Sequence, residues 1–295
     1  MNYSEEALLK IGSAALKKAA MNEQAKEYVL SNPILFNTLK KAADRYIGGE
    51  NLEETLNKVK MQNARQMKCS IEFMGENTST LPEAKEATDE FVNIAEAIDN
   101  GQLNSTISLD LSHIGLAISK DLCMENLNTI CSYAVRANIE VTISAENVDC
   151  TDEVISIFQA VSQYYSNLAI TLQAYLHRSN DDFKELIKIP GRIRIVKGAF
   201  ETPKNLSIPR GMELDQKYLS YIDQLLAQNH LCSIATHDKN IQAQAKQIIQ
   251  KYKTPADKYE FESLYGIRND QLFKLQEEGY STKLYFVYGK EWYLY

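Results

Sequence analysis

Short runs of apolar, β-branched and aromatic residues recur about every 30 residues from position 69 onward. Their length and composition are typical of strands rather than helices. We expect eight strands, over residues 69–74, 106–111, 140–145, 168–173, 193–196, 231–235, 259–264 and 283–287.

The stretches between these runs are amphipathic, with apolar residues returning at three- and four-residue intervals. Phe91, Ile94 and Ile98 share one face in this way. Eight strands alternating with helices predict an α/β protein whose parallel sheet closes into a (β/α)8 barrel of the TIM type. A doubly wound open sheet is the alternative. It would place a glycine-rich phosphate loop after the first strand, where Gly75 is the one glycine in Gly75-Glu76-Asn77-Thr78.

The N-terminal part of the chain lacks strand-like runs. Residues 4–66 have helical patterning, which Gly48-Gly49 interrupts before a second helix near residues 51–67. We therefore expect residues 1–66 to form a helical segment packed on the barrel. Residues 67–295 would form the catalytic barrel domain.

Composition narrows the function. The 295 residues are 44% hydrophobic, enough for a large core, and the net charge of −7 argues against a nucleic-acid partner. Five scattered cysteines without a CxxC pair fit a reducing compartment. The chain begins without a signal-peptide pattern and contains no apolar run of about 18 residues. We expect a cytoplasmic protein, and peripheral membrane contact stays open.

Polar clusters stand at the ends of three expected strands, in residues 173–176, 194–199 and 235–238. The carboxyl ends of parallel barrel strands meet at one face, where barrel enzymes build their sites. Arg194 is the most informative residue, because a guanidinium inside a barrel needs an anionic or π-electron partner. An outward Arg194 paired with a helix carboxylate is the alternative.

Two other chemistries deserve a comparison. Metal hydrolysis would use His113 and His237, but the chain has no His-x-His after the first strand, so we expect no metal. A Schiff-base lyase would use Lys197 as the nucleophile. Alternation along the strand weakens the lyase, since Lys197 points away from the barrel interior if Arg194 points into it.

Together, the clusters resemble the flavin-dependent proline dehydrogenases, from about Tyr46 to Tyr295. The motifs that carry the resemblance are residues 172–178, 192–200, 235–238, 260–266 and 285–293, which agree in order and spacing. The resemblance implies a distorted barrel that holds FAD and oxidises L-proline to 1-pyrroline-5-carboxylate. It also implies a quinone or another electron acceptor, and pyrroline-5-carboxylate dehydrogenase as the pathway partner. A diverged flavoprotein or pseudoenzyme acting on another cyclic amine is the alternative within the family.

The resemblance also implies roles for individual residues. Arg194 would contact the flavin and support its reduced, anionic form, and Ser144 would share the catalytic position. The expected FAD contacts are Ala145, Gln173, Arg194, Lys197, Gly198, Ala199, Thr236 and His237. Asp110, Tyr285 and Tyr295 would line the substrate pocket.

The sequence departs from the family pattern at several of these positions. Asp110, Ser144 and Glu262 stand where many members have lysine, aspartate and glutamine. The family also places an arginine pair, which grips the proline carboxylate, just beyond the tyrosine that matches Tyr295. We expect a chain shortened before that last helix rather than a natural divergence. A chain without the pair is expected to bind proline-like carboxylates about 100-fold more weakly.

Overall fold

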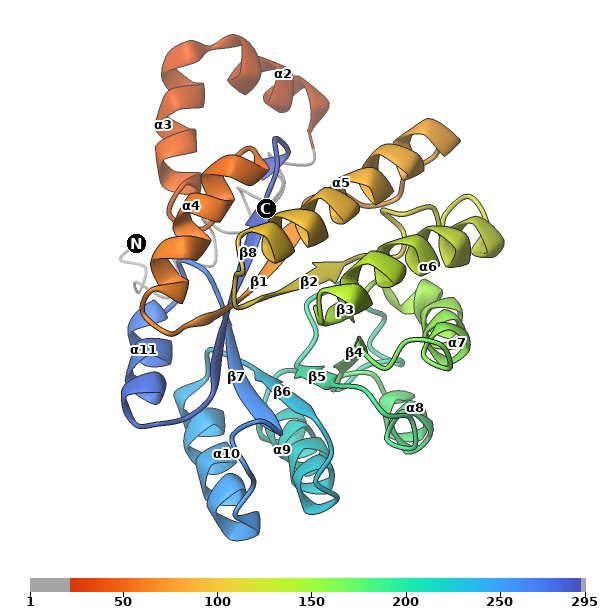
Figure 1. Ribbon diagram of the computed structural model, residues 1–295, viewed down its shortest axis with the longest axis vertical. Helices are drawn as coiled ribbons and strands as arrows, with labels where there is room; N and C mark the ends of the chain where they lie inside the picture. The colour runs from red at the N-terminus through yellow and green to blue at the C-terminus, as the bar shows by residue number, and fades with distance from the viewer. Residues whose placement is uncertain (1–21, 293–295) are drawn as a thin grey trace, which may run out of the picture.

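Eight parallel strands close into a single barrel in the computed structural model, which describes residues 22–292 (Figure 1). Each strand pairs with the next, and β8 pairs with β1 from Lys68 opposite Lys283 to Phe73 opposite Tyr288. The predicted barrel is confirmed, and this last pairing makes the open-sheet alternative wrong. The strands are β1 (Lys68–Phe73), β2 (Ser105–Leu109), β3 (Val141–Ile143), β4 (Leu168–Gln173), β5 (Ile193–Val196), β6 (Cys232–Ala235), β7 (Tyr259–Leu264) and β8 (Thr282–Tyr288).

A helix follows each of the first seven strands, and these helices surround the barrel (Figure 1). On the first of them, Phe91, Ile94 and Ile98 are buried as their spacing predicts. No helix within residues 22–292 combines the length and apolar character needed to cross a membrane. The helices are α5 (Leu81–Asn100), α6 (Lys120–Arg136), α7 (Thr151–Val161, after the short 3-10 turn η1, Val148–Cys150), α8 (Ser179–Leu186), α9 (Met212–Ala227), α10 (Lys239–Tyr252) and α11 (Asn269–Glu277).

Two strands, β2 and β3, end two residues earlier than the sequence predicts. The pairing of β2 with β3 stops at Leu109 opposite Ile143. At Asp110 the chain turns, and the carbonyl of Asp110 accepts a hydrogen bond from the His113 amide at 3.2 Å. Asp110 and Ala145 therefore lie in loops beyond the strand ends, at the mouth of the barrel.

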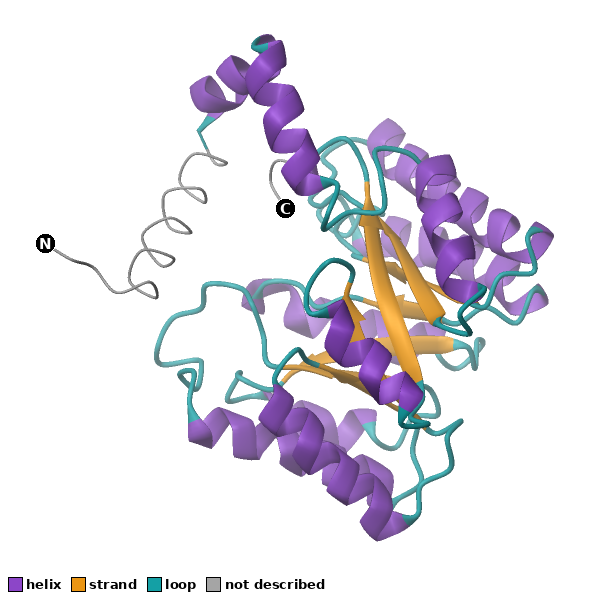
Figure 2. Cartoon of the chain, turned by 90° about the vertical axis from the view of Figure 1, so that its left-hand side faces the viewer, coloured by secondary structure: helices purple, strands orange, loops and turns teal. Residues whose placement is uncertain are grey.

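The N-terminal segment contains three helices in its described part, α2 (Glu23–Ser31), α3 (Pro33–Ala43) and α4 (Leu52–Asn63). A further break, not predicted from the sequence, separates α2 from α3. Pro33 disfavours the helical conformation at Asn32, which is extended at φ −106° and ψ 100°. In α4, Thr55 and Val59 are buried, whereas α3 has no buried residue. Figure 2 shows α2 and α3 standing apart from the ring of helices.

The barrel interior carries a buried charge network toward the N-terminal ends of the strands. The Lys283 ammonium is fully buried and lies 2.6 Å from Glu260 and 3.1 Å from Glu262. Arg192 pairs with Glu140 at 2.9 Å in the same layer. Burial lowers the pKa of Lys283, but the surrounding carboxylates outweigh burial and raise it. Unpaired buried charges are costly, so these groups stabilise the barrel only as a set.

Candidate active site at the mouth of the barrel

A cavity of about 620 Å³ opens at the C-terminal ends of the strands. Every strand, or the loop directly after it, contributes to the lining. The cavity lies where barrel enzymes place their active sites. The predicted site residues that line it are Asp110, Ser144, Ala145, Gln173, Arg194, Lys197, Gly198, Ala199, Thr236, His237 and Tyr285. Tyr295, the remaining predicted residue, lies outside the described residues.

Arg194 points into the barrel from β5 and is 5% exposed. Its guanidinium pairs with Glu262 of β7 at 3.1 Å and lies 5.2 Å from the ring centroid of Tyr285. It also donates to Thr171, Ser108 and Ser144 at 2.8, 3.0 and 3.1 Å. The outward alternative is therefore wrong. Burial opposes the charge, but Glu262 above all raises the pKa of Arg194, which keeps the cation fixed at the cavity floor.

Two carboxyl groups, Glu72 at the end of β1 and Asp110 after β2, form the acidic side of the cavity. Glu72 accepts hydrogen bonds from the Tyr285 hydroxyl and from Ser144 Oγ, the latter at 2.9 Å. Burial raises the pKa of Glu72, partly offset by Tyr285 and Arg194. Burial, followed by the charge of Glu72, raises the pKa of Asp110 well above its usual range.

The β4–β6 side of the cavity is made of polar groups and close backbone. The Gln173 amide donates to the carbonyl of Glu146 at 2.8 Å, while its buried Oε1 has no protein partner within residues 22–292. Gly198 has φ +109°, and a Cβ there would overlap the ring of Tyr175. The packing of Tyr175 therefore requires glycine at this point of the cavity wall.

Lys197 lines the cavity, but its ammonium belongs to two ion pairs. It lies 2.5 Å from Asp215 on α9 and 3.1 Å from Asp238. Asp238 is also the N-cap of α10 and accepts from the amides of Asn240 and Ile241. The side chains of Lys197 and Arg194 diverge, as alternation along the strand predicts. A Schiff-base nucleophile must be a free amine, so these pairs count against the lyase.

The two histidines considered for metal binding lie in different places. His237 lines the cavity and accepts from the Leu264 amide at 3.0 Å. His113 packs between Phe73 and Phe91, and burial lowers its pKa to about 4. Among residues 22–292, no three His, Cys, Asp or Glu side chains are arranged to hold a metal ion.

Sequence reasoning missed two charged residues of the cavity, Glu72 and Arg210. In β1, Ser70 and Glu72 alternate with apolar Ile71, a pattern that signals a polar inward face. Arg210 comes from the loop before α9 and donates to the carbonyl of Gly198 at 2.5 Å. The sequence around it carries no comparable signal, because only the folded loop brings it to the mouth.

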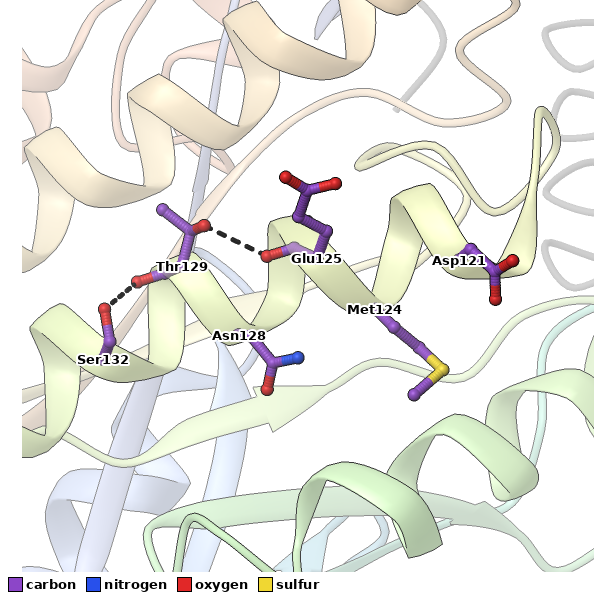
Figure 3. A pocket seen from close by; sticks show the side chains of 6 residues that line it. All are labelled: Asp121, Met124, Glu125, Asn128, Thr129 and Ser132. Carbon is purple, nitrogen blue, oxygen red and sulfur yellow. Dashed lines mark hydrogen bonds between the residues drawn. The ribbon is translucent and has the colours of Figure 1, made fainter.

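A second hollow lies on the outer face of α6 and is lined by one helix alone (Figure 3). Its hydroxyls are already used within the helix. Thr129 donates to the Glu125 carbonyl at 3.0 Å and Ser132 to the Thr129 carbonyl at 2.8 Å. Figure 3 shows no convergence of these side chains on a common point, so we attach no chemistry to this surface.

The barrel and its charged mouth define the class of the protein: a β/α-barrel enzyme with a polar cavity large enough for a sizeable organic ligand. The sequence pattern of the family described as proline dehydrogenase matches residues 55–293. This chain belongs to that flavin-dependent family.

Individual relatives agree with this assignment. Proline dehydrogenase 1 of Bacillus subtilis is 32% identical over 253 residues, covering 86% of this chain and 84% of the relative. Proline dehydrogenase of Deinococcus radiodurans is 27% identical over 258 residues, covering 86% and 83%.

A solved structure is similar in fold. The crystal structure of proline utilization A from Bdellovibrio bacteriovorus, inactivated by N-propargylglycine, superposes with a TM-score of 0.84 at 17% identity. The match covers 96% of this chain and 36% of that one, so this chain spans about a third of its length.

The residues at the mouth fit a bound flavin. Flavin rings present both hydrogen-bond donors and acceptors. Gln173 lines this cavity, and its buried Oε1 is an acceptor without a protein partner within residues 22–292. Gly198 lines the cavity and adds no side chain to the space that a flat ring would occupy. Arg194 is a fixed cation where a reduced flavin gains negative charge.

Proposed function

We propose that this chain oxidises L-proline to 1-pyrroline-5-carboxylate with FAD held at the mouth of the barrel. Family membership supports the reaction, and the β4–β6 side of the cavity supports the cofactor. The single observation that carries the proposal is the buried Arg194 at the floor of that cavity, held by four hydrogen bonds.

Bound FAD supplies a hydride acceptor for the C–N bond of the proline ring. Arg194 would hold a positive charge beside the flavin, where negative charge develops. Its four protein contacts fix the guanidinium before the substrate arrives, so little reorganisation is needed during the reaction.

The other contacts divide between cofactor and substrate. Gln173, Lys197, Thr236 and His237 would contact FAD through polar groups, and Ala145, Gly198 and Ala199 through backbone or small side chains. This second group leaves room for the ring system. Asp110, Ser144 and Tyr285 would face the substrate.

Further partners come from the relatives and the resemblance. Proline utilization A proteins are longer chains than this one, and pyrroline-5-carboxylate dehydrogenase is the enzyme we propose to consume the product. A quinone or another acceptor would reoxidise the flavin. A cytoplasmic location and peripheral membrane contact stay predictions.

The experiment is a titration of the purified protein with FAD, followed by L-proline and a dye acceptor. We expect flavin absorption bands that stay with the protein through gel filtration, and dye reduction that depends on proline. If the protein gains no flavin spectrum, the proposal that it binds FAD is contradicted. If the protein binds FAD but leaves the dye oxidised at every proline concentration, the proposal that L-proline is the substrate is contradicted.

A further inference from the structure

The acidic side of the cavity contains carboxyl groups in two different states. Glu72 is engaged by the hydroxyls of Tyr285 and Ser144. The carboxyl group of Asp110 also lines the cavity, but makes no hydrogen bond or ion pair with any residue in 22–292. A partly buried carboxyl group without a protein partner is free to serve a ligand.

The other cavity carboxylates are occupied like Glu72. Glu262 pairs with Arg194 and Lys283 at 3.1 Å each. Asp238 pairs with Lys197 and caps α10. In the described part of the chain, Asp110 is therefore the acidic group of the cavity that remains available for chemistry.

Near neutral pH, oxidation of a cyclic amine is accelerated by such a group. The ring nitrogen of proline is a secondary ammonium at neutral pH, and its lone pair must be freed before a C=N bond can form. Hydride departure from the ring carbon therefore requires that a proton leave the nitrogen. Arg194 and the paired Lys197 cannot accept this proton, because both carry positive charge.

We propose that Asp110 accepts the proton of the substrate ring nitrogen, an inference that rests on the proposed function. The N–H bond breaks and its proton passes to the Asp110 carboxylate. A hydride then leaves the adjacent ring carbon for FAD, and the nitrogen lone pair forms the C=N bond. The substrate loses two electrons, the flavin gains two, and the proton remains on Asp110 until water removes it.

The charges around Asp110 favour this role. Glu72 on β1, Glu76 in the loop after it, and Glu146 after β3 all face Asp110 with negative charge, and Arg194 on β5 opposes them. Burial and these three carboxylates raise the pKa of Asp110. A raised pKa strengthens the carboxylate as a base toward an ammonium. The same negative field attracts the ammonium end of proline and repels its carboxylate, so it orients the substrate.

The test is anaerobic stopped-flow reduction of the FAD-loaded protein by saturating L-proline, from about pH 6 to about pH 10. Because a raised pKa keeps Asp110 protonated at low pH, the wild-type rate should rise with pH. Asp110→Asn should reduce flavin about 100-fold more slowly near neutral pH, the usual contribution of a general base. The deficit should shrink as solution itself deprotonates the ring nitrogen.

A second readout separates proton transfer from folding. Asp110→Asn removes a negative charge, so tetrahydrofuran-2-carboxylate should bind equally well or more tightly while flavin reduction slows. Glu146→Gln is the companion variant, because Glu146 raises the pKa of Asp110 but does not line the cavity. That variant should keep fast flavin reduction at high pH, and its rate profile should shift to lower pH because Asp110 loses its proton more readily.

The outcomes distinguish the two proposals. If L-proline does not reduce the flavin bound to the wild-type protein, the proposed function is overturned. Wild-type reduction with an equal rate in Asp110→Asn, or with a deficit that is the same at every pH, overturns the role of Asp110 alone.

Discussion

The two sides of the barrel mouth are built in opposite ways. On the β4–β6 side the polar groups are tied down: Arg194 makes four hydrogen bonds, and His237 accepts from a backbone amide. On the acidic side, Glu72 and Asp110 have raised pKa values, and the carboxyl group of Asp110 has no hydrogen-bond or ion-pair partner in the described chain. A fixed cation can stabilise charge without reorganising. A carboxyl group whose proton is easily gained and lost suits proton transfer.

The largest effect should come from replacing Arg194, the hydrogen-bonded cation on the β4–β6 side. Arg194→Met leaves the buried Glu262 without one of its two cationic partners, which should cost about 3–5 kcal/mol of unfolding free energy. It should also slow flavin reduction by about 100-fold or more. Urea unfolding and single-turnover reduction measure the two losses.

The double variant Arg194→Met with Glu262→Gln separates these losses. Removing the carboxylate that has lost one of its two cations should recover part of the stability and none of the rate. A double variant that regains wild-type reduction would mean that Arg194 acts through folding alone.

A smaller effect is expected when Gly198, on the same side of the cavity, is replaced. Gly198→Ala forces a Cβ into the ring of Tyr175 at φ +109°, so FAD should bind about 10-fold more weakly, the equivalent of 1.4 kcal/mol. Gly279→Ala is the control, since Gly279 also has positive φ, +87°, but open space around it. It should lose stability and keep its FAD affinity in a fluorescence titration. Equal FAD affinity in both variants would remove Gly198 from the cofactor site.

The smallest effect concerns the acidic side and the stability of the fold. Because folding raises the pKa of Asp110, its contribution is fully present below the unfolded pKa of about 3.9 and is lost as pH rises through the folded value. Asp110→Asn should therefore be more stable than wild type at neutral and alkaline pH, by on the order of 1 kcal/mol. Thermal unfolding at several pH values measures this. A variant that is less stable at alkaline pH would show that Asp110 has a structural partner.

The sequence predicts the fold well because eight strand-like runs recur with amphipathic helical stretches between them, and such parallel strands close into a barrel. It also predicts most of the mouth, since polar residues at strand ends must meet there. It does not show which carboxylate faces Arg194, because Glu262 comes from β7, 68 positions further along the chain. Glu72 could have been predicted, because Ser70 and Glu72 alternate with apolar Ile71 and so mark a polar inward face of the first strand.

The central claim is that the β4–β6 side of the cavity holds the flavin and the acidic side holds the proline nitrogen. A crystal structure of the protein with dithionite-reduced FAD and L-proline, a pair that cannot react, tests it most directly. We predict that the flavin ring lies against Gln173, Arg194 and Gly198, with the proline nitrogen within hydrogen-bond distance of Asp110. A flavin ring seated against Glu72 and Asp110, or a proline whose carboxylate faces Asp110, would contradict this arrangement.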